Sequence, residues 1–120
     1  MAETGTTQGP GRLSVVSTAT DGMRVLTVAG EIDHHTVGAL QKALSADAGA
    51  SPRTVADMRQ VTFMDSTGIN ALIAAHHQLT RAGGWLRLAG PQAPVMRIVE
   101  LVGVDAVIPC HPTLREALTP

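Results

Sequence analysis

The side chains best suited to chemistry lie in residues 65–68, which read Asp-Ser-Thr-Gly. Apolar residues follow at the spacing of one helix face, at Ile69, Leu72 and Ile73, so this run stands where a helix begins. The first turn of a helix carries unpaired backbone N–H groups and a partial positive charge, which together favour an anion. A serine at such a point is exposed and well placed to carry a phosphate. The pattern therefore makes Ser66 a candidate for a phosphorylation switch.

A second role for these residues is open at this stage. Ser66 could be the N-cap of the helix, since serine is favoured at that position, and capping and phosphate acceptance can coexist. Asp65 could likewise cap the helix, or it could orient the serine. Residue types alone do not separate these roles.

Two catalytic or signalling alternatives fail on spacing. In an aspartic protease the glycine stands two residues after the aspartate, whereas here Thr67 intervenes, and an alternating strand–helix pattern is wrong for an all-β protease. A phosphoacceptor receiver domain would use an aspartate at a strand end, such as Asp57. It would also need an acidic pair after the first strand and a lysine late in the chain, but that pair is missing and the only lysine is Lys42.

Metal and redox chemistry also find little support. Histidines form the adjacent pairs 34–35 and 76–77, and neighbours on a helix point about 100° apart, so a pair cannot chelate a metal from one face. We predict no metal site and no cofactor, and we expect His76 and His77 on the solvent side of the central helix. The single cysteine, Cys110, excludes an internal disulfide and suits a reducing compartment.

The elements that must position residues 65–68 follow from hydrophobic periodicity and from glycine and proline breaks. Their order predicts an α/β fold, with a mixed sheet of four to five strands and about four helices packed mainly on one face. We expect a flexible tail over residues 1–12 and one folded domain over 13–120. Within the domain we expect a hairpin (13–18 and 24–29, turning at 21–22), helices from about 36 to 48, 66 to 82, 94 to 102 and 112 to 118, and strands at 54–57, 85–89 and 106–108, with residues 61–64 ending a loop.

Composition limits the partners. The 120 residues include 44% hydrophobic and 16% charged residues, which is typical of one globular domain with an aliphatic core, since there is one Phe, one Trp and no Tyr. Nine basic and ten acidic residues leave a net charge of −1, so nothing favours direct binding to nucleic acid or to an anionic membrane. No apolar run approaches the roughly 20 residues that span a bilayer, and the N-terminus does not read as a signal peptide. We expect a cytoplasmic protein.

Several segments together resemble one known family. They are residues 30–33 (Gly-Glu-Ile-Asp) with Thr36, residues 57–58 with 61–68, the glycine pair 83–84, and residues 95–105 (Val-Met-Arg-Ile-Val-Glu-Leu-Val-Gly-Val-Asp). With them the chain resembles a STAS domain and, more narrowly, a bacterial anti-sigma factor antagonist, also called an anti-anti-sigma factor. The resemblance covers about residues 13 to 118, and its most specific part is the Asp-Ser-Thr-Gly run at a helix start.

This resemblance implies a function by binding, without catalysis. In that family an anti-sigma factor that is also a serine kinase phosphorylates the serine of the motif, which is Ser66 here. The unmodified antagonist binds this partner and frees a sigma factor for transcription, the phosphorylated form cannot bind, and a PP2C-type phosphatase usually resets the cycle. The implied partner-binding residues are Glu31, Asp33, Thr36, Asp65, Ser66, Thr67 and Gly68, although Asp33 could equally cap the first helix. The pair His34-His35 departs from the common pattern and could alter the choice of partner.

Two other functions stay open. One is a STAS signalling module of another regulatory assembly, with the same fold outside the sigma pathway. The other is a small nucleotide-binding or hydrolytic protein that uses the acidic residues around Ser66. Against the second, the chain has no glycine-rich phosphate loop with a lysine and no evident pair of general acid and base.

Overall fold

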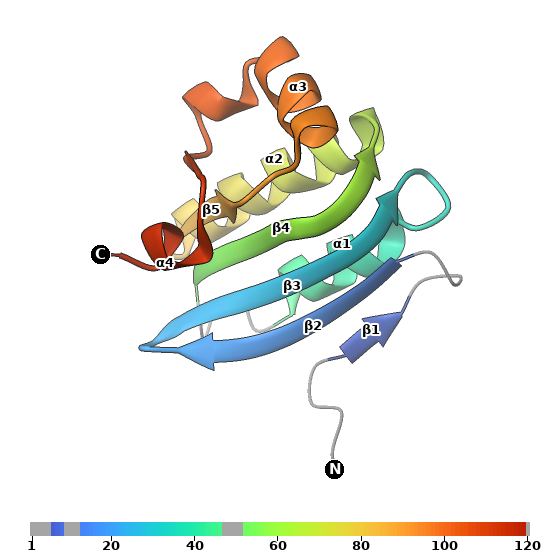
Figure 1. Ribbon diagram of the computed structural model, residues 1–120. Coiled ribbons are helices and arrows are strands. Elements are labelled where there is room, and N and C mark those ends of the chain that lie inside the picture. Colours follow the sequence, from blue (N-terminus) through green and yellow to red (C-terminus); the bar gives the residue numbers. More distant parts are fainter. Residues whose placement is uncertain (1–5, 9–12, 47–51, 120) are drawn as a thin grey trace.

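The computed structural model describes residues 6–8, 13–46 and 52–119, which form one mixed sheet with helices packed against it (Figure 1). The strands pair in chain order, with β1, β2 and β3 antiparallel and β3 to β6 parallel. The strands are β1 (Thr6–Gln8), β2 (Leu13–Thr20), β3 (Met23–Ile32), β4 (Arg53–Met64), β5 (Trp85–Ala89) and β6 (Cys110–His111). The helices are α1 (Val37–Ser45), α2 (Ser66–Arg81), α3 (Ala93–Leu101) and α4 (Leu114–Ala117), with a 3-10 turn at Val104–Ala106.

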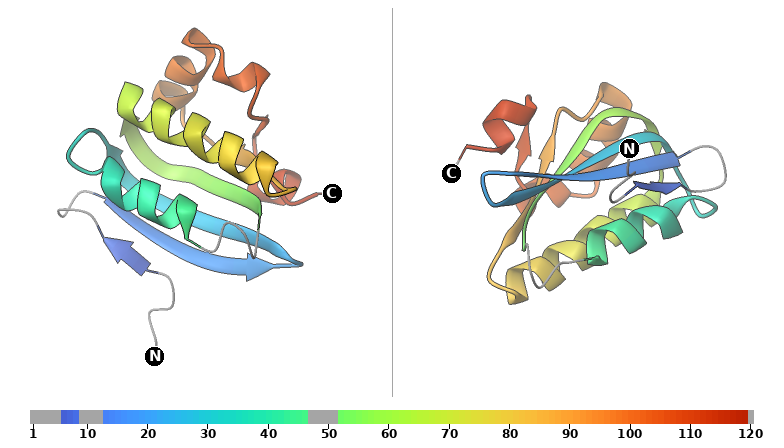
Figure 2. Two further views of the ribbon diagram at one scale, coloured as in Figure 1. Left: turned by 180° about the vertical axis from the view of Figure 1, so that it is seen from behind. Right: turned by 90° about the horizontal axis from the view of Figure 1, so that it is seen from below.

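The helices cover mainly one face of the sheet. From behind and from below, α1 and α2 lie side by side over that face (Figure 2). Leu40 of α1, Leu72 of α2 and Val95 of α3 join one aliphatic core with inward-facing strand residues. The short α4 is the exception, since Ala117 packs with Val55 in a separate small cluster on the other face. The predicted mixed sheet with its helices is confirmed.

The opening hairpin has the predicted turn. Asp21 and Gly22 both have positive φ, at 51° and 78°, which is the backbone of a type I′ turn that matches the twist of paired strands. β3 then runs past Gly30, where a break was expected, to Ile32. The expected tail over residues 1–12 contributes the edge strand β1, and its other residues lie outside the described part of the chain.

Two strand predictions were wrong. The segment at 54–57 is part of the twelve-residue β4, so residues 61–64 belong to a strand and not to a loop. The pairing of β4 with β3 shifts register twice. Exposed residues of β4 therefore occur in adjacent pairs, and the alternation of buried and exposed residues that is typical of a strand is not visible in the sequence. Residues 106–108 are not a strand either: the Ile108 N–H bonds to the carbonyl of Val104 at 2.8 Å in a helical turn, and β6 follows at Cys110.

Candidate functional site

The predicted phosphorylation site lies where β3 and β4 end and α2 begins (Figure 1). Ile32 and Met64 are paired at the ends of the two parallel strands, and the backbone N–H of Asp65 donates to the carbonyl of Ile32 at 3.1 Å. The loop after β3 and the first turn of α2 therefore lie side by side at one edge of the sheet.

Asp65 is the N-cap of α2, which decides between the two capping alternatives. Its Oδ1 accepts hydrogen bonds from the backbone N–H of Thr67 at 2.9 Å and from the Thr67 hydroxyl at 2.5 Å. Ser66 occupies the first helical position and its side chain is exposed. Among the described residues its hydroxyl has no hydrogen-bond partner, so Ser66 carries the available hydroxyl of this turn while that of Thr67 is engaged.

The loop after β3 is held by its own side chains. Oδ1 of Asp33 accepts from the N–H groups of His35 at 2.9 Å and Thr36 at 3.2 Å, and the Thr36 hydroxyl donates to the carbonyl of Glu31 at 2.8 Å. Thr36 is fully buried, so it supports the loop from within, and its predicted contact with a partner would require this loop to move. Asp33 stabilises the loop but is not the cap of the first helix, because the N-cap of α1 is Thr36 and it has no side-chain cap hydrogen bond. Both Asp33 and Glu31 keep part of their surface exposed.

Gly68 lies on the buried face of the first turn of α2. A Cβ at this position would lie 2.5 Å from Cγ of Met64 and 2.8 Å from Cγ2 of Ile32, closer than real Cβ contacts allow. Its role is therefore to let the first turn of α2 approach the ends of β3 and β4. Whether Gly68 also contacts a partner stays a prediction.

We expect Gly68→Ala to lower the free energy of unfolding by about 1–3 kcal/mol through overpacking, against which the better helix propensity of alanine returns up to about 1 kcal/mol. Gly38→Ala is the matched control, because Gly38 lies in α1 and a Cβ added there would have no neighbouring atom within 4 Å. Urea unfolding should show the first variant to be less stable and the control to be unchanged or more stable. Equal stability of the two variants would contradict the close approach at Gly68.

Phe63 is a site residue that the sequence patterns did not indicate, since they placed it at the end of a loop. It lies in β4 opposite Glu31 of β3, and its side chain is 47% exposed. The signal available in the sequence was its rarity, because Phe63 is the only Phe in the chain and stands three residues before Ser66.

The two histidine pairs lie on the loop after β3 and on α2. The rings of His34 and His35 lie with centroids 3.9 Å apart on the exposed loop after β3. His77 is exposed as expected, but His76 is half-buried and its Nδ1 is buried without a hydrogen-bond partner, so the expectation of a solvent-facing His76 was wrong. In the described ranges no three His, Cys, Asp or Glu residues come together as a metal site would require.

Asp57 lies inside β4 and is 1% exposed, and it accepts two hydrogen bonds from the guanidinium of Arg59, at 2.9 Å from Nε and 2.7 Å from Nη2. These bonds and the carboxylate charge raise the pKa of the Arg59 guanidinium. Asp57 is thus committed to an ion pair within its own strand, unlike an exposed phosphoacceptor at a strand end.

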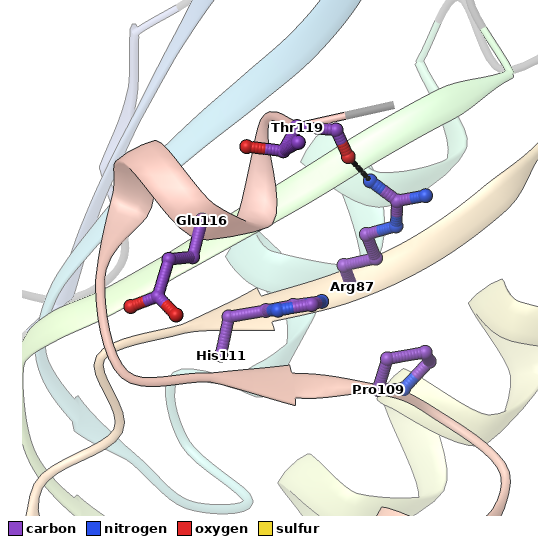
Figure 3. A pocket seen from close by; sticks show the side chains of 5 residues that line it. All are labelled: Arg87, Pro109, His111, Glu116 and Thr119. Carbon is purple, nitrogen blue, oxygen red and sulfur yellow. Dashed lines mark hydrogen bonds between the residues drawn. The ribbon is translucent and has the colours of Figure 1, made fainter.

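A cavity away from Ser66 lies between β5, β6 and α4 (Figure 3). Its volume is about 470 Å³, and Arg87, Pro109, His111, Glu116 and Thr119 line it. Nη1 of Arg87 donates to the carbonyls of Ala117 at 2.9 Å and Thr119 at 2.8 Å, so this arginine holds the C-terminal segment against β5. Neither this cavity nor two others of about 270 Å³ includes Asp65 or Ser66.

Cys110 lies partly buried at the start of β6. Burial, together with the nearby carboxylates of Asp105 and Glu100, raises the pKa of its thiol to about 11. The thiol therefore stays protonated near neutral pH and is a poor nucleophile.

In the described part of the chain, no helix combines the length and apolar character needed to cross a membrane.

Comparisons with known proteins agree with this architecture. The STAS domain family model matches residues 14–117. The anti-sigma-F factor antagonist RsfB of Mycobacterium tuberculosis is 29% identical over 111 residues, which cover 92% of this chain and 90% of RsfB. The crystal structure of an anti-sigma factor antagonist from Mycobacterium paratuberculosis matches with a TM-score of 0.82 and 33% identity, over 92% of this chain and 95% of that one. The phosphorylated form of the Bacillus cell fate determinant SpoIIAA has the same fold, with a TM-score of 0.68 and 22% identity over 87% of this chain and 96% of SpoIIAA.

Proposed function

The chain belongs to the STAS domain family, and from this membership we propose that it acts as an anti-sigma factor antagonist. The relatives that cover nearly the whole chain carry this function in their names. The protein works by binding, as a regulator without catalysis of its own, in the cytoplasm.

The partner is an anti-sigma factor with serine kinase activity, and Ser66 is the residue that it phosphorylates. The observation that carries this proposal is the exposed Ser66 hydroxyl at the start of α2, next to a Thr67 hydroxyl that Asp65 engages. SpoIIAA, which has the same fold, has a structure in its phosphorylated form, and this supports the proposal that a domain of this fold carries a phosphate. Unmodified protein binds the partner and releases a sigma factor, phosphorylation ends the complex, and a PP2C-type phosphatase restores it.

The binding surface consists of the exposed or half-exposed residues around Ser66: Glu31, Asp33, Asp65, Ser66 and Thr67. Thr36 and Gly68 hold this surface in shape, since both are buried. His34 and His35 are exposed at the edge of this surface, where they influence which partner binds.

A pull-down from native lysate tests this proposal. Unmodified protein and the phosphomimetic Ser66→Asp are compared as bait, and retained proteins are identified by mass spectrometry. Thr20→Asp is the charge control, because Thr20 is exposed at the opposite end of the sheet. Unmodified and Thr20→Asp baits should retain a serine kinase that also binds a sigma factor, and Ser66→Asp should not. Equal retention by Ser66→Asp, or retention of no such kinase, would contradict the proposal.

A further inference from the structure

We propose that Phe63 anchors the partner beside Ser66 by inserting its ring into an apolar pocket on the partner's surface. The inference rests on the proposed function, since it concerns the same partner. It adds Phe63 to the binding surface around Ser66, as a side chain that determines the affinity for the partner.

Phe63 stands out among the apolar residues of the fold. In the described part of the chain, five large apolar side chains are exposed: Val16, Phe63, Leu101, Val102 and Val107. Of these five, Phe63 alone is aromatic and alone lies within three residues of the start of α2 in the sequence. Aromatic side chains near the centre of an interface are typical of the few residues that carry most of the binding energy.

The strand pairing explains why the ring is left outside the core. Ile32 and Met64, which follow in the two strands, are 0% and 5% exposed and fill the core under α2. Phe63 and its register partner Glu31 therefore point to the other face, because successive strand residues alternate. About half of the ring stays in water, and a partner that covers it gains the hydrophobic free energy that folding leaves unused.

The charges near the ring limit the pocket that can take it. The register partner of Phe63 is the partly exposed, acidic Glu31, and Asp65 follows two residues later with its Oδ1 accepting from Thr67. A matching pocket is therefore apolar and carries no acidic group at its edge. Residues 61–70 contain no lysine or arginine. A phosphate on Ser66 would place a near-dianion at the edge of this apolar contact, where removing it from water is costly. The Phe63 ring and Ser66 then control partner binding together, because the ring provides affinity and the phosphate removes it.

The test measures the affinity of the kinase retained in the pull-down, purified, for wild type, Phe63→Ala and Leu101→Ala. Leu101 is 82% exposed at the end of α3, so its truncation controls for the loss of any exposed apolar side chain. We expect Phe63→Ala to raise the Kd at least about 30-fold and Leu101→Ala to change it less than about threefold. Both variants should keep the melting temperature within a few degrees of wild type.

Three results would overturn the anchor. The first is a Kd for Phe63→Ala within about threefold of wild type. The second is a loss of the folded state in Phe63→Ala, which would assign the ring to the core. The third is a wild-type dimer, seen by sedimentation without partner, that Phe63→Ala dissociates, because the ring would then cover a second copy of the chain.

The outcomes also separate this inference from the proposed function. If Ser66→Asp abolishes binding while Phe63→Ala leaves it intact, the anchor alone is wrong. If no kinase is retained by the unmodified chain, the proposed function fails and the anchor fails with it.

Discussion

Phosphorylation of Ser66 is expected to weaken partner binding by about a thousandfold while leaving the fold intact. A partner surface that fits a neutral hydroxyl must remove a near-dianion from water when Ser66 carries a phosphate. A penalty of about 4 kcal/mol corresponds to this loss of affinity.

The fold should hardly respond, because two local effects oppose each other. A phosphate at the first turn of α2 meets a favourable helix dipole, typically worth about 0.3–1 kcal/mol at an exposed position. The neighbouring Asp65 repels it with similar strength, and Oδ1 of Asp65 already takes the backbone N–H of Thr67. We therefore expect stability to change by about 1 kcal/mol or less.

The two forms are to be compared by partner affinity, circular dichroism and amide chemical shifts. Shift changes confined to residues near Ser66, with equal circular dichroism, are the expected result. Changes that extend to β5 at Trp85 and to α4 would instead indicate a conformational mechanism.

Leu72→Ala is expected to lower the free energy of unfolding by about 2–5 kcal/mol. Leu72 is fully buried in the core that α2 shares with the sheet, and Ile69 beside it is 4% exposed. The truncation removes apolar contacts and leaves a cavity that the packed strands cannot close completely.

Leu101→Ala serves as the matched control for Leu72→Ala, because the same atoms are removed from a side chain that is 82% exposed. Urea unfolding of the control should agree with wild type within about 0.5 kcal/mol. A loss for Leu72→Ala no larger than for the control would mean that α2 does not pack as described.

The helices could be predicted from the sequence because their signals are local. Ile69 and Leu72 mark the buried face of α2, and Gly83 ends it with a φ of 90°. The same holds for α3, which ends before Gly103 at a φ of 77°. The Asp21-Gly22 turn is equally local, since both residue types tolerate positive φ.

The extent of β4 could not be predicted, because it depends on a partner strand far away in the sequence. Val61 pairs with Gly30 and Phe63 with Glu31, after register shifts that no local pattern encodes. For that reason the sequence placed the end of β4 in a loop, and nothing in it indicated that Phe63 is held on the outer face.

The chemistry of the site was predictable only in part. The Asp-Ser-Thr-Gly run located the helix start, but whether Asp65 or Ser66 caps it depends on side-chain orientation, since both residue types are good caps. The burial of Thr36 could not be predicted either, because its hydroxyl donates to the carbonyl of Glu31 in β3, a contact that residue types do not indicate.

Mapping of the phosphate by mass spectrometry tests the central claim most directly. Wild type, Ser66→Ala and Thr67→Val are each incubated with the retained kinase and labelled ATP. We predict that wild type and Thr67→Val take up label on Ser66, whereas Ser66→Ala takes up none and still binds the kinase. Label on Thr67 or elsewhere in Ser66→Ala would contradict the assignment of Ser66 as the phosphorylated residue of this domain.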